Sequence, residues 1–189
     1  MRFEKSVLFI TAFLGLVTCA QAGLISFSGQ FDPSLATVVT NGGNGYFDSS
    51  GAPGAVTIWG SDSGSYLYIR TFVYWTITSS VSDLSFNWDY LTYDEEGPYY
   101  DPAGYCIDDS CIQITYNGGN NSQSGTVGGL NLQAGHTFGF YVDTYDDIMG
   151  AARITITGEA VPEPTTLGLM AASLAALLVF RRKISGFGR

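Results

Sequence analysis

An acid-rich segment in the middle of the chain carries the side chains best suited to chemistry. Residues 93–109 read YDEEGPYYDPAGYCIDD, and the Gly and Pro among them favour loops. Six carboxylates fall within 16 residues: Asp94, Glu95, Glu96, Asp101, Asp108 and Asp109. Calcium takes about six to eight oxygen ligands, which flexible loops with several carboxylates supply. The segment is therefore a candidate calcium site, and calcium is the one cofactor that the sequence suggests.

A second acidic group follows later in the chain, where Asp143, Asp146 and Asp147 lie in VDTYDD. These residues could approach the first group across the edge of a folded domain. Neither group has the spacing of an EF-hand or of a nonapeptide calcium repeat. The sequence signal for calcium is therefore nonspecific, and solvated loops that keep the protein soluble are the simpler interpretation.

Aromatic residues in the same region raise the question of carbohydrate binding. Tyr93, Tyr99, Tyr100 and Tyr105 lie among the acidic residues, and a flat aromatic ring can stack on a sugar while its polar edge stays hydrated. Burial in a core is the alternative for each of them, and it is the expectation for the other aromatic residues, which mostly alternate along the chain.

Catalytic motifs do not accompany these groups. His136 is the one histidine and follows Gly135 at an expected turn. The chain has neither a Gly-x-Ser-x-Gly nucleophile motif nor a His-x-x-x-His pair. Two carboxylates could in principle serve a glycosidase, but an acidic loop does not place them at a working separation. We therefore expect a protein that is not an enzyme, with a hydrolase as the least favoured alternative.

Cys106 and Cys111 enclose four residues in CIDDSC. In an oxidising compartment this even, local pair predicts a disulfide that pins a loop or the end of a hairpin. A zinc site would need further ligands, and the single histidine lies 25 residues from Cys111. The spacing also differs from the Cys-x-x-Cys of redox enzymes.

The elements that must position these residues are short β-strands. Apolar residues alternate with polar ones in LSFNWDY (residues 84–90), HTFGFYVD (136–143) and RITITG (153–158), a period typical of antiparallel strands with one buried face. The segment YLYIRTFVYWTI (66–77) is apolar on both faces, which favours a central strand. Gly-rich turns separate about nine or ten such runs. We expect an all-β antiparallel sandwich, with jelly-roll-like connections or a closed barrel as variants.

The beginning of the chain predicts export. Arg2 and Lys5 precede an apolar run at residues 7–17, and Ala20-Gln21-Ala22 fits a signal-peptidase site, so residues 1–22 read as a signal peptide. A lipoprotein whose lipidated first residue is Cys19 and a retained anchor helix are weaker alternatives.

The exported body is strongly acidic. Residues 23–160 hold 15 Asp and Glu against two Arg and no Lys, a net charge of −13 before His136. This charge repels nucleic acid, which excludes DNA and RNA as partners, and attracts cations. Its length suits one domain.

The end of the chain has three parts in a fixed order. Val161, Pro162, Glu163 and Pro164 form an extended exit from the domain, because each proline disfavours helix in the residue before it. Residues 165–180 form a hydrophobic helix whose apolar part, 14 residues at 167–180, spans about 21 Å, less than a hydrocarbon core of about 30 Å. A basic tail at 181–189 follows, in which Arg181, Arg182 and Lys183 favour the cytoplasmic side of a membrane.

With the Pro-Glu-Pro motif, the hydrophobic helix and the basic tail in this order, the segment 161–189 resembles the PEP-CTERM sorting signal of Gram-negative bacteria that make exopolysaccharide. The resemblance implies processing near the Pro-Glu-Pro motif by an exosortase, a membrane-embedded cysteine protease or transpeptidase. The domain would first be held in the periplasm by the inner-membrane helix and would then reach the cell surface or the extracellular space. We expect a structural or adhesive envelope or matrix protein linked to exopolysaccharide or biofilm; the alternative is a carbohydrate- or calcium-binding module.

Overall fold

The computed structural model describes residues 23–159. The predicted signal peptide, the Pro-Glu-Pro motif, the hydrophobic helix and the basic tail lie outside this range. Within residues 23–159, no helix has the length and apolar character needed to cross a membrane.

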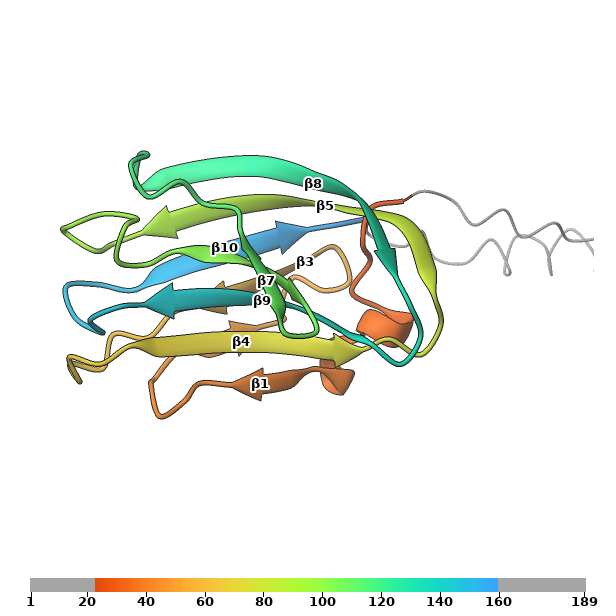
Figure 1. Ribbon diagram of the computed structural model, residues 1–189, viewed down its shortest axis with the longest axis horizontal. Helices are drawn as coiled ribbons and strands as arrows, with labels where there is room; N and C mark the ends of the chain where they lie inside the picture. Colours follow the sequence, from red (N-terminus) through yellow and green to blue (C-terminus); the bar gives the residue numbers. More distant parts are fainter. Residues whose placement is uncertain (1–22, 160–189) are drawn as a thin grey trace, which may run out of the picture.

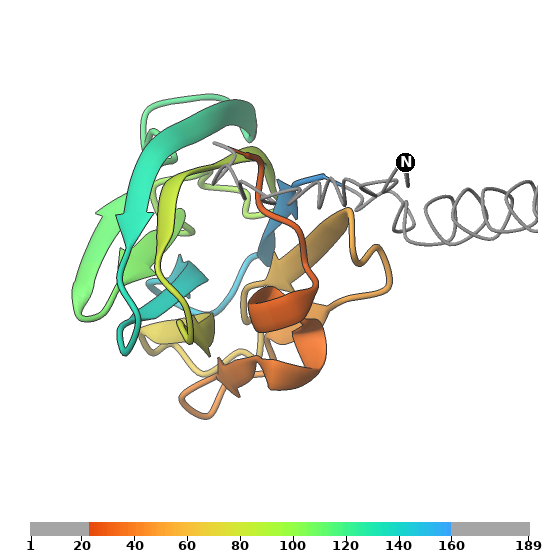
Figure 2. The ribbon, with the colours of Figure 1, turned by 90° about the vertical axis from the view of Figure 1, so that its right-hand side faces the viewer.

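Two five-stranded antiparallel sheets pack face to face (Figures 1 and 2). The first sheet contains, in spatial order, β1 (Thr37–Val39), β4 (Ile69–Thr76), β9 (Thr137–Thr144), β6 (Ala103–Ile107) and β7 (Ser110–Gln113). The second contains β2 (Tyr46–Asp48), β3 (Ala55–Trp59), β10 (Ala152–Thr157), β5 (Val81–Thr92) and β8 (Ser122–Leu132). Most connections cross between the sheets, as in a jelly roll. The predicted sandwich is confirmed.

The alternating segments form the inner faces of both sheets. In β5, Leu84, Phe86 and Tyr90 are buried, while in β10 Ile154 and Ile156 are buried against them. The hydrophobic core joins these residues to side chains of the first sheet, among them Trp75 and Phe138. Because side chains alternate along a strand, each strand needs only its inner residues to build this core.

The central strand of the first sheet is β9, with β4 between it and the edge strand β1. From Phe138 onward, every residue of β9 is buried. In β4 only the inward residues are fully buried, whereas Phe72 and Tyr74 on the other face are half-buried and stack with ring centroids 5.2 Å apart. The central strand predicted over residues 66–77 is β4, which begins at Ile69 and pairs with a strand on each side. Its outer face is apolar in sequence because two aromatic rings there cover each other.

Two one-turn 3₁₀ helices, η1 (Gly29–Phe31) and η2 (Pro33–Leu35), cover one end of the sandwich (Figure 2). The side chain of Phe31 packs there against Trp75 and Phe138. The first and last described residues lie side by side, since the amide of Glu159 donates to the carbonyl of Ile25 at 2.8 Å. Both ends of the described chain lie toward the right of Figure 1, away from the loops that hold most of the candidate site residues.

Candidate functional site

Four loops meet at the end of the sandwich drawn on the left of Figure 1. They are residues 60–68 between β3 and β4, 93–102 between β5 and β6, 114–121 between β7 and β8, and 145–151 between β9 and β10. These loops carry six exposed tyrosines, namely Tyr66, Tyr68, Tyr93, Tyr99, Tyr116 and Tyr145. We call this surface the tyrosine end. Exposed aromatic residues gathered in one place mark a binding surface more strongly than scattered ones do.

Three of the loops are joined by contacts among the exposed rings. The ring centroid of Tyr145 lies 5.9 Å from that of Tyr68 and 6.3 Å from that of Tyr99, and Tyr99 packs edge-on against Tyr100 at 5.2 Å. Tyr99 is 54 % exposed and Tyr145 42 % exposed. The rings thus form one partly exposed cluster that joins three loops.

A second aromatic group lies at the same end, on the outer face of the second sheet. Trp59, at the end of β3, stacks between Tyr46 of β2 and Tyr93, with centroids 5.7 and 6.3 Å apart and planes within 12° of parallel. The guanidinium of Arg153 lies 5.6 Å from the Trp59 ring. Tyr46 and Tyr93 are each about half exposed, so the outward faces of this stack are open.

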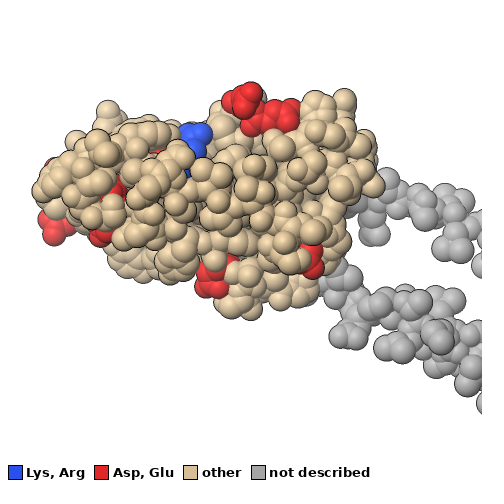
Figure 3. Space-filling view, turned by 90° about the horizontal axis from the view of Figure 1, so that it is seen from below, with Lys and Arg blue, Asp and Glu red and all other residues tan. Residues whose placement is uncertain are grey.

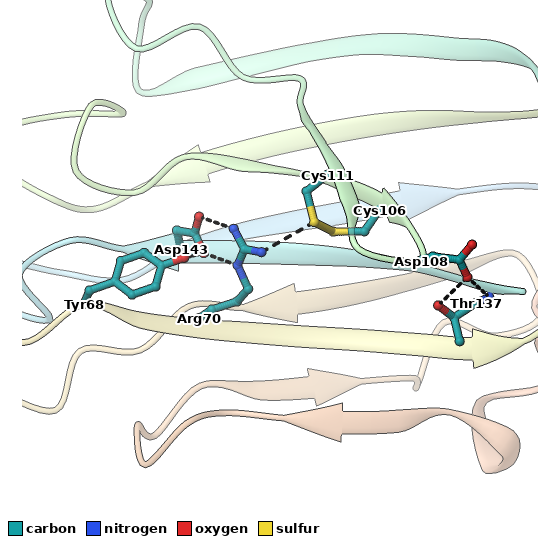
Figure 4. The surroundings of a disulfide bond; sticks show 7 residues. All are labelled: Tyr68, Arg70, Cys106, Asp108, Cys111, Thr137 and Asp143. Carbon is teal, nitrogen blue, oxygen red and sulfur yellow. Dashed lines mark hydrogen bonds and ion pairs between the residues drawn. A yellow bond between two sulfur atoms is a disulfide. The ribbon is translucent and has the colours of Figure 1, made fainter.

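An ion pair anchors the tyrosine cluster to the first sheet. Arg70 of β4 donates from Nε to Oδ1 of Asp143 in β9 at 2.6 Å, and from Nη2 to Oδ2 at 2.8 Å (Figure 4). The Tyr68 hydroxyl donates to the same Oδ1 at 2.9 Å. Burial and the neighbouring Asp143 charge raise the pKa of Tyr68 to about 12, so this hydroxyl stays a donor at neutral pH.

Arg70 also contacts residues on its other sides. Its guanidinium lies 4.2 Å from the ring centroid of Tyr141, and Nη1 is 3.5 Å from the sulfur of Cys111. With its two bonds to Asp143, this side chain therefore links β4, β9 and β7.

A buried aspartate closes the loop at residues 60–68. The carboxylate of Asp147 accepts hydrogen bonds from the Ser63 amide at 3.0 Å, from the Ser65 amide at 3.2 Å and from the Ser63 hydroxyl. Burial alone would raise the pKa of Asp147, but hydrogen bonds from Ser61, Ser63 and Ser65 outweigh it and hold this pKa well below the usual range. Asp147 is thus a structural anion that ties two loops of the tyrosine end together.

Three further aspartates at this end are less well satisfied. Asp94 and Asp101 are 1 % and 0 % exposed, and Asp146 is half-buried. Oδ1 of Asp94 accepts from the Glu96 amide at 2.6 Å, and Oδ2 of Asp101 accepts from the Thr92 hydroxyl at 2.8 Å. The other oxygen of each carboxylate is buried without a hydrogen-bond partner, as is Oδ1 of Asp146.

The three charges also act on one another. Burial, with smaller effects from the charges of Asp94 and Asp146, raises the pKa of Asp101 to about 7. Hydrogen bonds from the hydroxyls of Thr92 and Thr144 lower this pKa but do not outweigh burial. Burial and the charge of Asp146 likewise raise the pKa of Asp94. Asp101 is therefore the carboxyl of this group that takes up a proton most readily.

The six carboxylates proposed from the sequence as calcium ligands separate into two places. Asp94 and Asp101 lie at the tyrosine end with Glu95 and Glu96, both of which are exposed. Asp108 and Asp109 lie in the β6–β7 turn near the opposite end, where Asp108 accepts from the Thr137 amide at 2.8 Å (Figure 4). Asp108 also contacts His136 Nδ1 at 2.5 Å. Among residues 23–159, no three His, Cys, Asp or Glu side chains are already grouped so as to hold a metal ion.

The predicted disulfide is present. Cys106 of β6 and Cys111 of β7 are directly opposite in the hairpin register, with a Cα–Cα distance of 4.0 Å, and their sulfur atoms are bonded. Of the tyrosines proposed for sugar binding, Tyr93 and Tyr99 are exposed and Tyr100 is half-buried, whereas Tyr105 lies in β6, buried against Phe86.

The charged side chains of residues 23–159 are mostly acidic. On the face drawn in Figure 3, acidic atoms appear at several separate places and basic atoms in the upper middle. Arg70 and Arg153 are the two arginines of residues 23–159, and both are engaged by aromatic rings. The acidic carboxylates therefore have little basic charge near them.

A comparison with protein families matches residues 160–183 to a PEP-CTERM protein-sorting motif. The chain carries a PEP-CTERM sorting signal. The match covers the Pro-Glu-Pro residues, the apolar run and the Arg181–Lys183 cluster, and it confirms the resemblance to exosortase substrates. No curated protein matches this PEP-CTERM chain.

The chain is also similar to solved structures, and three of them contain carbohydrate-binding modules. One is TmCBM61 in complex with β-1,4-galactotriose, with 11 % sequence identity and a TM-score of 0.35; the match covers 71 % of this chain and 95 % of that chain. Another is the GH26-CBM35 β-(1,4)-mannanase of Podospora anserina, with 21 % identity and a TM-score of 0.30; the match covers 69 % of this chain and 26 % of that chain. The third is a CBM35 from Paenibacillus barcinonensis, with 11 % identity and a TM-score of 0.28; the match covers 67 % of this chain and 95 % of that chain.

Sequence reasoning missed several residues of the tyrosine end. Tyr66, Tyr68 and Arg70 lie in a run that reads as a strand, whereas Tyr145 lies within the acidic motif VDTYDD. The run SDSGSYLY, in which turn residues precede two tyrosines, is the one signal that could have placed Tyr66 and Tyr68 in a loop.

Proposed function

We propose that this PEP-CTERM protein is exported, processed by an exosortase and retained at the cell surface or in the extracellular matrix, where its tyrosine end binds polysaccharide without cleaving it. The role is structural or adhesive. The observation that carries the proposal is the gathering of exposed tyrosines on loops that lie opposite the two chain ends.

The position of the tyrosine end supports this role. The sorting signal follows residue 159 directly, so a domain held by its C-terminal segment would turn the opposite loops away from the membrane. Tyrosine rings present apolar faces for the C–H groups of a sugar ring, while their hydroxyl groups can bond to sugar hydroxyls. A surface of this kind suits a long, hydroxyl-rich polymer.

The buried carboxylates argue for binding rather than hydrolysis. A glycosidase needs two carboxyl groups facing the scissile bond in an open cleft. Asp94 and Asp101, the most perturbed carboxyls of this end, are 1 % and 0 % exposed, so a sugar ring would not reach them without movement of the loops. The carbohydrate ligand would therefore be held and released unchanged.

Electrophoresis of the full chain through native gels tests the proposal, with the gels containing exopolysaccharide purified from the bacterium that produces this protein. We expect the polysaccharide to retard the wild-type chain, and the double variant Tyr99→Ala, Tyr145→Ala to lose most of this retardation. Leu35→Ala is the matched control, because Leu35 is 60 % exposed but lies in η2 at the other end of the sandwich. Equal retardation of all three chains, or none with the wild type, would contradict the proposal.

A further inference from the structure

The strongest unexplained feature of the domain is the group Asp94, Asp101 and Asp146. Each side chain leaves one oxygen buried without a hydrogen-bond partner: Oδ2 of Asp94, Oδ1 of Asp101 and Oδ1 of Asp146. A buried carboxylate oxygen without a partner is costly, and such groups are normally matched by a donor, by a water molecule or by a metal ion.

The basic side chains of the domain do not supply that match. Arg70 already forms two hydrogen bonds with Asp143, and Arg153 lies over Trp59. His136 lies with Asp108 at the other end of the sandwich. Within residues 23–159 these are the basic side chains of the sequence, so the three carboxylates have no protein cation as a counter-charge.

We infer that Asp94, Asp101 and Asp146 bind one calcium ion between the loops 93–102 and 145–151. Calcium is preferred over a transition metal because every side-chain ligand is a carboxylate oxygen, the donor type that hard cations take. It is preferred over magnesium because Asp94 and Asp101 are almost fully buried, and magnesium is reluctant to give up its water.

The carboxylates alone do not complete the site. Since no three of these side chains already stand in a ligand arrangement among the described residues, binding would draw Asp146 toward the two buried aspartates, and loop carbonyl groups and water would fill the remaining positions. The loop 145–151 has the backbone for close approach. Gly150 has φ +124°, and a Cβ there would come within 2.5 Å of the Tyr93 carbonyl oxygen.

This calcium site goes beyond the proposed polysaccharide binding, and either can hold without the other. It would nevertheless affect the same surface, because the two loops that it joins carry Tyr99 and Tyr145. Calcium would restrain the two loops relative to each other, and with them the relative position of these two rings.

Calorimetric titration of calcium chloride into the chelator-treated full chain at pH 7.5 tests the site directly, with thermal unfolding as a second readout. We expect one calcium ion per chain and a rise of several degrees in Tm. Asp94→Asn and Asp101→Asn should each weaken calcium binding at least tenfold. Both variants keep the oxygen that accepts from Glu96 or Thr92, so they should fold.

Asp109→Asn is the matched control, since Asp109 is an exposed aspartate of the same acidic segment but lies in the β6–β7 turn. It should bind calcium as the wild type does. Absence of heat and of a Tm shift at 10 mM calcium, an unchanged affinity in Asp101→Asn, or an equal response to magnesium chloride would each overturn the inference. Retardation by polysaccharide, measured separately, reports on the proposed function alone.

Discussion

Arg70 and Asp143 face each other on neighbouring strands and share two hydrogen bonds, Nε to Oδ1 at 2.6 Å and Nη2 to Oδ2 at 2.8 Å. The Asp143 side chain is 6 % exposed and that of Arg70 is 28 % exposed. The pair joins β4 to β9 directly below the tyrosine end. Removing the arginine would leave a nearly buried carboxylate with the Tyr68 hydroxyl as its remaining side-chain partner.

Arg70→Met should therefore destabilise the domain. We expect a loss of about 1–3 kcal/mol in the free energy of unfolding, because an uncompensated buried charge is costly while the partial exposure of Arg70 screens the pair. Urea denaturation measures this loss. Arg153→Met is the control, since Arg153 has no carboxylate partner among the described residues, and a loss as large in that variant would show that the ion pair contributes little.

Stability without calcium should fall as the pH rises from about 4 to 7. The pKa of Asp101 is about 7 in the folded chain, above its ordinary value of 3.8, so the folded state holds a proton in this range that the unfolded state has lost. Each pH unit then costs up to about 1.4 kcal/mol, with no further loss above the folded pKa.

Chelator-treated full chain, unfolded in urea at several pH values, provides the measurement. Asp101→Asn should flatten the dependence between pH 4 and 7. Asp147 has the opposite effect on stability, because its pKa in the folded chain is lowered. Its stabilising contribution is present above the ordinary aspartate pKa of 3.8 and is lost only as the pH falls below that value. The pH range in which Asp147 acts is therefore separate from that of Asp101. A slope unchanged in Asp101→Asn would assign the proton to another group.

Loss of the disulfide should weaken the domain moderately. The Cys106–Cys111 bond closes a loop with a sequence separation of five, for which the chain-entropy estimate is about 2 kcal/mol. The double variant Cys106→Ala, Cys111→Ala should lose this amount in urea denaturation. Dithiothreitol should lower the stability of the wild type to the same level and leave the variant unchanged; a response of the variant to the reductant would rule out the bond as the cause.

The sorting motif can be tested in the exporting cell. Pro162→Ala with Glu163→Ala should leave the unprocessed, full-length chain in the inner membrane, because the motif near which an exosortase would act is changed while the apolar run and basic cluster remain. Membrane fractionation and immunoblotting measure this distribution. Thr165→Ala with Thr166→Ala is a neighbouring control that should be processed normally. Normal surface delivery of the first variant would contradict exosortase recognition of these residues.

Local sequence patterns were sufficient for the fold class and for the sorting signal. The alternation around Phe86 and Tyr90 predicts a strand with one buried face, because side-chain direction in a strand depends on position parity alone. The Cys106–Cys111 pairing is equally local, since a tight hairpin sets its own register. The PEP-CTERM signal is a linear order of residues, which a sequence displays in full.

The acidic segment shows where such patterns fail. Asp101 and Asp108 belong to one stretch of sequence, but β6 lies between them, and five residues at about 3.3 Å each carry them toward opposite ends of the sandwich. Asp94 and Asp146, by contrast, are 52 positions apart in sequence and influence the same buried carboxyl. Proximity in the chain thus does not show which of these carboxylates lie together in the fold.

The amino-acid sequence alone therefore specifies that this chain is an acidic, exported β-sandwich protein with a sorting signal, because composition, strand periodicity and linear motifs are local properties. Only the tertiary structure gathers the tyrosines of four loops on one end, buries Asp94 and Asp101, and pairs Arg70 with Asp143. These relationships depend on strand order and register across two sheets, where residues far apart in the chain become neighbours through packing that no local pattern encodes.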